Sequence, residues 1–438
     1  MPTIIGIIFF CCAFYCFLYE EDGLLGLLII SGVFEAASAI NIAERGIQPY
    51  YVVAAFIIAR GLINRFSGTR SIPVVSQGKW LLAFGAISLV SAFVFPYIFA
   101  GTPIYDPKIG IDDGLFNRPP LSFSLNNVVQ ASYLLLHIVT AFSILAIKFS
   151  GKKTRLAFLW AFYIEAAFLV AESFCQLVGI TFPLFLVLNN PGYSLWQLSG
   201  EINGTRNPGT FAEPSLAGVF LVVYCIGFLA EYLAGKGKAF RVIASLIASG
   251  LVASSSSLLT ICLVPGALLL RYSPFRFPYY VKVRQAKRIA WIATLLIIPV
   301  VLSLAVFSGY RELLTTLTIS KGDSGSFINR TASDLYSLQL LIQTHGMGVG
   351  LGSNRSSSLL STLVSNVGIA GTLAFLMFYC KLFVHLPERY AWFGWAGFAM
   401  LLNMCLGIAD VTIPLFWIPI LLAIQFSAEQ ISDSQKTM

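Results

Sequence analysis

The sequence has few charged residues and few histidines. Only 11% of its 438 residues are charged and three are histidine, whereas 57% are apolar. Soluble domains carry about 25% charged residues, so this composition excludes an ordinary soluble protein and indicates a polytopic membrane protein. All eight cysteines lie in apolar runs, and none lies in a long polar loop. The cysteines therefore imply neither a disulfide framework nor a metal site.

Two motifs that would indicate nucleotide chemistry are also missing. No Asp-x-Asp occurs, so a metal-chelating site for a nucleotide sugar is not indicated. The glycines at 346, 348, 350 and 352 do not fit G-x-G-x-x-G and follow no predicted strand, which rejects a dinucleotide-binding fold. We expect these glycines to form a backbone turn whose N–H groups face an anion.

Long apolar runs fill most of the chain and predict an all-α protein with about 13 transmembrane helices (12 to 14) in a single transmembrane domain, 1–438. The first run lacks a basic segment before it, so we expect a span and not a cleaved signal peptide. The expected spans are 2–19, 23–40, 48–64, 80–101, 126–149, 156–180, 214–234, 240–254, 256–271, 289–308, 357–380, 390–409 and 412–426.

The distribution of lysine and arginine predicts the orientation. One set of mostly short loops holds 19 of the 28 basic residues, and the opposite set holds eight. Because basic loops stay in the cytoplasm, the long loops 102–125, 181–213 and 309–356 should face outward. This topology accounts for the net charge of +8, so we expect no binding to nucleic acid.

The loop 309–356 is the longest segment that cannot lie in lipid. Phe327, Leu335, Leu338 and Ile342 recur near helical spacing, so we expect a helix over 327–343 with one apolar face. The arginines around this helix suggest an anion held at a membrane surface.

Each candidate in this loop has a structural alternative. Arg330 could pair with Asp334 one helical turn later. Arg355 could be a snorkelling flank of the next span. His345 could be a loop residue without a role in proton transfer.

The second outward loop ends in a stretch rich in Gly and Pro around Arg206, and Glu213-Pro214 opens the next span. For Glu213, a structural role is open: the dipole of the following helix favours a carboxylate at this position. For Arg206, contact with a lipid headgroup is open.

Six charged residues lie inside expected spans. Glu165 and Glu172 are seven residues apart and so share a helix face. Structural pairing, for instance of Glu35 with Arg60, and a proton or ion relay of a transporter both remain open. The six are Glu35, Arg60, Glu165, Glu172, Glu231 and Asp410.

The stretch Arg206-Asn-Pro-Gly-Thr-Phe-Ala-Glu-Pro-Ser215 resembles the Arg…Gly-x-Phe-x-Glu/His-Pro segment of the O-antigen polymerase/ligase superfamily. The later order is similar: Ser324-Gly325 and Arg330, then Gly348-Val-Gly350-Leu-Gly352-Ser353, then Gly368-Ile-Ala-Gly371 inside a span. The resemblance covers the order and spacing of residues 200–375.

Two departures from the superfamily matter. Ligases carry a His-Asn after the glycine turn, but the corresponding position here is Ser357, and His345 lies before the turn. This difference favours the polymerase branch. The repeated Arg-x10-Gly pattern of some polymerases is also missing.

The resemblance implies a GT-C-like, metal-independent glycosyltransferase without a cofactor, in a bacterial inner membrane. It would transfer a glycan from undecaprenyl diphosphate to a sugar hydroxyl of a second lipid-linked repeat unit at the periplasmic face. Arg206 and Arg330, with Arg355 as a third candidate, would bind the diphosphate. Glu213, with Asp334 or His345 behind it, would be the general base. The implied partners are the lipid-linked oligosaccharide, membrane lipid, and a chain-length regulator and flippase of the same pathway.

Two other functions stay open. A ligase that transfers O-antigen to lipid A-core would use the same arginines but needs the missing histidine. A transporter or flippase of lipid-linked sugar would explain the carboxylates within the spans. It would not explain why the arginines gather in outer loops, and we find no internal repeat typical of many transporters.

Overall fold

The computed structural model describes residues 1–42, 45–68, 77–107, 111–114, 117–180, 182–193, 207–269 and 325–436. Arg206, the expected span 289–308 and the first part of the loop 309–356 lie outside these residues. The described chain is all-α apart from one antiparallel hairpin, in which Ile40 pairs with Ile47. The elements are α1 (Ile4–Tyr19), α2 (Gly23–Ser31), β1 (Ile40–Ile42), β2 (Arg45–Ile47), α3 (Pro49–Phe66), α4 (Gly78–Ile98), α5 (Ile111–Gly114), α6 (Leu125–Ile144), α7 (Gly151–Leu177), η1 (Leu184–Leu186), α8 (Pro214–Leu233), α9 (Ala239–Val252), α10 (Ser255–Leu269), α13 (Gly325–Gln343), α14 (Leu359–Val384), η3 (Glu388–Tyr390), α15 (Ala391–Gly407) and α16 (Pro414–Lys436).

Five of the described helices, α4, α6, α7, α8 and α14, are long and apolar enough to cross a membrane. Four shorter apolar segments lie in α1, α9, α10 and α16. The described helices therefore agree with a multi-pass membrane protein.

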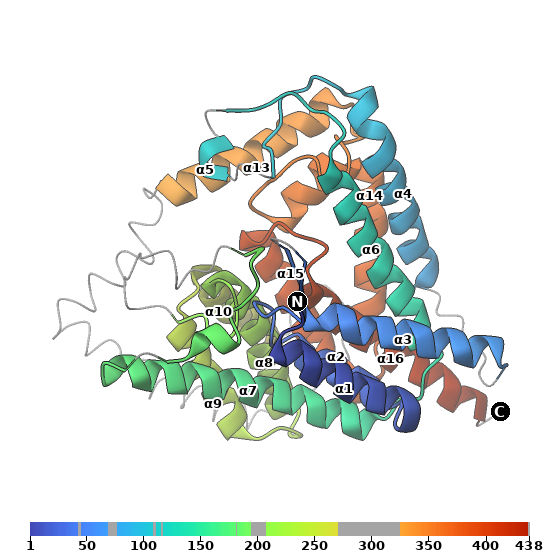
Figure 1. Cartoon of the computed structure of the whole chain (residues 1–438), viewed down its shortest axis with the longest axis vertical. Coiled ribbons are helices and arrows are strands. Elements are labelled where there is room, and N and C mark those ends of the chain that lie inside the picture. Colours follow the sequence, from blue (N-terminus) through green and yellow to red (C-terminus); the bar gives the residue numbers. More distant parts are fainter. Residues whose placement is uncertain are drawn as a thin grey trace.

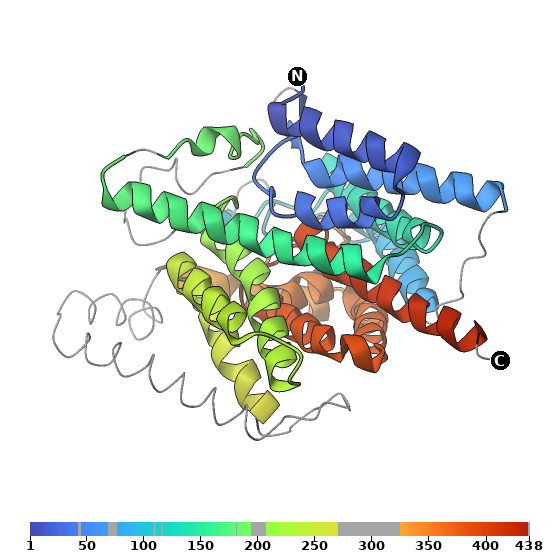
Figure 2. The ribbon, with the colours of Figure 1, turned by 90° about the horizontal axis from the view of Figure 1, so that it is seen from below.

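Two sets of helices run in clearly different directions (Figure 1). The first three helices pack together and α2 also packs on α7, whereas α4, α6 and α14 pack side by side. Figure 2 shows α1, α3 and α7 running in similar directions across the molecule. The two groups meet where α3 contacts α6.

Helix α8 is the centre of the bundle. It contacts α9, α10 and α15, and its apolar sequence is buried on every side. A helix that is apolar all round is expected in such a position because it has no polar face to present elsewhere.

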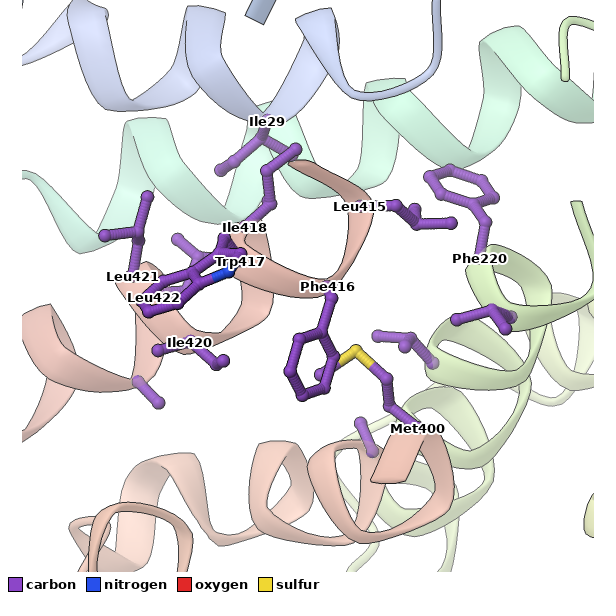
Figure 3. Packing of buried hydrophobic residues seen from close by; sticks show 14 of the residues in the cluster. Ile29, Phe220, Met400, Leu415, Phe416, Trp417, Ile418, Ile420, Leu421 and Leu422 are labelled. Carbon is purple, nitrogen blue, oxygen red and sulfur yellow. The ribbon is translucent and has the colours of Figure 1, made fainter. Parts of the chain in front are cut away.

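The core beside α8 is closed by the first turns of α16. Ile418 and Leu415 face Ile29 and Phe220 from two other helices (Figure 3). Trp417 is fully buried, and its indole N–H donates to the Val411 carbonyl at 2.8 Å. This bond satisfies the polar group that a buried tryptophan brings into an apolar core.

The expected span 23–40 is wrong as a continuous helix. Helix α2 ends at Ser31, and the chain then pairs with segments far away in the sequence. The Ser38 N–H donates to the Asn189 side chain at 2.8 Å, and the Ala36 N–H donates to the Thr210 carbonyl at 3.4 Å. These long-range contacts satisfy the backbone in place of further helical turns, which hydropathy does not reveal.

The helix expected over 327–343 is confirmed as α13. Its apolar side chains Leu335 and Ile342 are exposed, at 62% and 76%, whereas Ser333 and Ser337 are fully buried. The helix thus rests on these serines together with the buried Tyr336 and Leu340, whereas the predicted apolar face is exposed.

Candidate functional site

Two expected outer loops pack into one structure, which we call the cap and define as residues 99–107, 117–124 and 325–358. Its small core consists of Ile104, Tyr105, Leu121, Tyr336, Leu340 and Val349. The Tyr336 hydroxyl donates to the Pro103 carbonyl at 2.7 Å. Burial raises the pKa of Tyr336, and the nearby Arg118 guanidinium opposes this shift. Figure 1 shows α13 in the upper part of the view, at the level of the upper ends of α4 and α6.

The glycine turn and the span glycine form one unit. Gly368 has φ +69° and ψ −170°, a conformation almost restricted to glycine, and it interrupts α14. A Cβ at this position would lie 2.3 Å from the Met347 carbonyl oxygen. The Val349 N–H donates to the Ser365 carbonyl at 2.7 Å, and the Gly350 N–H donates to the Asn366 carbonyl at 2.9 Å.

Three of the four glycines of this turn, Gly346, Gly348 and Gly350, donate their N–H groups within the protein. Leu351 N–H donates to the Ser91 hydroxyl at 3.2 Å, and Gly348 N–H donates to the Thr344 hydroxyl at 2.9 Å. The expectation that the glycine N–H groups face an anion is therefore wrong for Gly346, Gly348 and Gly350. The glycines are needed for close backbone approach instead.

Asp334 is hydrogen-bonded to Ser357. Its two carboxylate oxygens accept hydrogen bonds from the Ser357 N–H and the Ser357 hydroxyl, both at 2.8 Å. Asp334 therefore connects α13 to the start of α14.

Arg330 does not pair with Asp334 within the described part of the chain, so the expected i,i+4 ion pair is absent there. Its guanidinium lies at the end of α15 and the start of α10, because a Cβ at Gly407 would be 3.8 Å from Arg330 Nη1 and 3.5 Å from the Ser256 hydroxyl. Arg330 is exposed, and its positive charge is favoured by the carbonyl end of α15.

The other two candidates in the cap are also exposed. Arg355 fixes the cap through its backbone N–H, which donates to the Tyr105 carbonyl at 2.9 Å. Among the described residues, its guanidinium makes one long contact, at 3.4 Å from the Pro107 carbonyl. His345 follows α13 with φ +52°.

Glu213 begins α8 but does not cap it through its side chain. The Ser215 hydroxyl donates to its carboxylate. The Glu213 carboxylate therefore makes no hydrogen bond to an N–H group of α8, but its charge still lies at the N-terminus of this helix, where the helix dipole favours it, and it is exposed.

The segment 207–213, which follows Arg206, is held by two buried carboxylates. Glu165 accepts from the Thr210 hydroxyl at 2.7 Å and from the Thr210 N–H at 3.3 Å. Glu35 accepts from the Ala212 N–H at 3.2 Å. Asn207 donates to the Leu169 carbonyl at 3.1 Å, so α7 binds the segment at two points.

These supporting carboxylates were not identified as site residues from the sequence. The expected pairing of Glu35 with Arg60 is wrong, because Arg60 Nε lies 2.7 Å from Glu21. The seven-residue spacing of Glu165 and Glu172 was the available signal, since it placed two carboxylates on one face of α7.

The segment 207–213 and the Arg330 side chain both approach the junction of α9 and α10. The Asn207 N–H, directly after Arg206, donates to the Leu251 carbonyl at 3.3 Å. Arg330 reaches the same junction beside Ser256. The described residues contain no group of three or more His, Cys, Asp or Glu side chains placed to hold a metal ion. Neither a scan against models of known protein families nor a search among curated proteins finds a match to this chain.

Proposed function

We propose that this chain polymerises lipid-linked polysaccharide repeat units at the periplasmic face of a bacterial inner membrane. One observation carries the proposal: the segment after Arg206 and the helix bearing Arg330 approach the same α9–α10 junction. Both segments belong to the stretches that resemble the O-antigen polymerase/ligase superfamily. A GT-C-like bundle of about 13 spans is part of this proposal.

The diphosphate of the donor is the group that these arginines would bind. Arg330 is exposed and has no ion pair in the described part of the chain, so its guanidinium is available to an anion. Arg206 would bind the same diphosphate from the other loop, and Arg355 would add a third cation. Such groups stabilise the negative charge that develops on a leaving group.

The reaction needs one proton acceptor. The acceptor sugar hydroxyl forms a new C–O bond with the anomeric carbon, and the bond from that carbon to the diphosphate oxygen breaks. Undecaprenyl diphosphate leaves with the bonding electrons, and the hydroxyl proton passes to a carboxylate. Glu213 is the first candidate for this base, because its carboxylate is exposed. Asp334 is the second candidate, because its carboxylate already accepts hydrogen bonds from Ser357, and His345 is the third.

The alternatives predict different observations. A ligase of the superfamily would need a histidine where this chain has Ser357. A transporter would need carboxylates free for a pathway, but Glu165 and Glu35 bind the segment 207–213.

Deleting the gene and sizing the surface polysaccharide tests the proposal. Loss of the polymerase leaves one repeat unit per lipid. Loss of a ligase leaves polymer on undecaprenyl diphosphate that is not transferred, and loss of a flippase leaves no surface sugar. Either of the last two results would overturn the proposal.

A further inference from the structure

A polar cavity of about 240 Å³ lies between β2, the start of α3, α6, the 190–193 loop and the α15–α16 connection. None of the residues expected to bind the diphosphate or to act as the base lies in it, but Asp410, one of the six charged residues of the expected spans, does. Its walls combine three tyrosines with amide, hydroxyl and charged side chains. The principal lining residues are Arg45, Gln48, Tyr51, Gln130, Tyr133, Asn190, Tyr193, Asp410 and Thr412.

The aromatic wall is built from two helices. Tyr51 and Tyr133 stack with ring centroids 5.0 Å apart and an interplanar angle of 16°. Tyr193 enters from the 190–193 loop, and its hydroxyl accepts from Gln48 at 2.8 Å. Tyrosines present an apolar ring together with a polar tip, so they suit a ligand with apolar and hydroxylated faces.

The polar wall keeps hydrogen-bonding groups for a ligand. Asp410 Oδ1 accepts from the Thr412 N–H at 2.7 Å, and its second oxygen has no hydrogen-bond partner among the described residues. One end of the Gln130 amide bonds the Thr412 hydroxyl at 2.6 Å, which leaves the other end for a ligand. Both donors and acceptors are therefore present.

The charge balance narrows the class of ligand. One guanidinium, Arg45, and one carboxylate, Asp410, line the cavity. A site for a polyanion would need more cations, and a metal site would need more carboxylates. A neutral molecule with several hydroxyl groups matches a wall that offers single donors and acceptors beside aromatic rings.

The cavity is connected to both motif-bearing regions. Gln48 donates to the Glu35 carbonyl at 2.7 Å, and Glu35 holds Ala212, next to Glu213. On the other side, a Cβ at Gly352 in the glycine turn would lie 3.1 Å from the Gln130 side chain.

From these observations we infer that the cavity binds a single sugar ring of the glycan substrate. Its volume lies below the ~300–1,000 Å³ of pockets for drug-sized ligands, so one ring fits better than an oligosaccharide. This assignment rests on the proposed function for the identity of the glycan, but sugar binding itself can be measured without catalysis.

Saturation-transfer NMR on the full chain in nanodiscs tests the inference. Nanodiscs are needed because maltoside detergents would themselves offer sugar rings. The probes are the neutral methyl glycosides of glucose, galactose, mannose, N-acetylglucosamine and N-acetylgalactosamine. At least one should receive saturation from the wild-type protein. Tyr133→Ala and Asp410→Asn should each weaken its binding about tenfold, the loss expected for one contact.

The matched control is Tyr97→Ala, which removes a tyrosine that is 65% exposed at the end of α4, outside the cavity. It should bind like wild type. Asp410→Asn keeps the size of the side chain, so it reports on binding even if Tyr133→Ala fails to fold. Absence of transfer to every glycoside, or unchanged binding in Asp410→Asn, would overturn the inference.

The result separates the two proposals. Glycoside binding without polymerisation of lipid-linked units would remove the polymerase and keep the sugar site. Polymerisation with an unchanged acceptor KM and unchanged glycoside binding in Asp410→Asn would keep the polymerase and remove the sugar site.

Discussion

The glycine turn with the residues that follow it, 346–358, and the segment 207–213 both lie in stretches on which the superfamily resemblance depends. Different kinds of side chain hold these two regions in place. Neutral amides hold the glycine turn: Asn366 accepts from the N–H groups of Ser353 and Asn354 at 3.1 and 2.9 Å. Carboxylates hold the segment 207–213, with Glu165 on Thr210 and Glu35 on Ala212. Since a buried carboxylate loses its hydration, its hydrogen bonds are offset by a desolvation cost that amides largely avoid. We therefore expect the glycine turn to be the more firmly held region.

The largest expected effect is from Asn366→Leu. Asn366 also donates to the Asn354 carbonyl at 2.9 Å, so the change removes the partners of both the N–H and the carbonyl of the buried Asn354. At ~1–3 kcal/mol for each such group, the free energy of unfolding of the cap should fall by roughly 3 kcal/mol or more.

Limited proteolysis of the cap against denaturant measures this change. Asn117→Leu, at an exposed position in the same cap, is the control and should stay close to wild type. Equal stability of Asn366→Leu and the control would contradict the amide network.

A smaller effect is expected from Glu165→Leu. The substitution removes the acceptor of Thr210 but also removes a buried carboxylate, so a loss of about 1–2 kcal/mol is expected. Glu165→Gln keeps an acceptor oxygen and should remain within ~1 kcal/mol of wild type. Thermal unfolding in detergent measures both. A loss with Gln as large as that with Leu would show that the charge, not the acceptor, holds the segment.

The smallest effect is expected from Arg118→Gln. The Arg118 guanidinium lies 4.1 Å from the centre of the Tyr336 ring, on the exposed side of the cap. A cation–π contact at an exposed site contributes ~0.5–1 kcal/mol. Arg118→Lys keeps the charge and should lose less, as measured by the same denaturant series. A loss above that of Asn366→Leu would reverse the proposed ranking.

The sequence predicted those features that depend on local pattern. The helix over 327–343 follows from its apolar spacing, and the runs at 80–101, 126–149, 156–180, 214–234 and 357–380 correspond to α4, α6, α7, α8 and α14. Contacts between residues far apart in the sequence were not predictable. Hydropathy does not show that Arg60 pairs with Glu21, or that α2 stops at Ser31 because residues 36 and 38 bond distant segments.

The features of the candidate site likewise divide into local ones, for which the sequence gave a signal, and tertiary contacts, for which it gave none. The connection between the glycine turn and Gly368 depends on backbone conformation, for which the glycines gave a signal. The supporting roles of Glu165 and Glu35 depend on tertiary contact, which no spacing rule supplies. The polar cavity joins five separate parts of the chain, so no single stretch of sequence indicates it.

The central claim is that Arg330 acts on a lipid diphosphate. The most direct measurement is the rate of polymerisation of purified lipid-linked repeat units by Arg330→Ala, compared with Arg118→Ala, which removes another exposed arginine of the cap. Loss of one preorganised charge-stabilising group lowers kcat by about 10²–10³-fold. We predict that loss for Arg330→Ala, with near-wild-type rates for Arg118→Ala at equal protein level. Full-length polymer formed at the wild-type rate by Arg330→Ala would contradict the account.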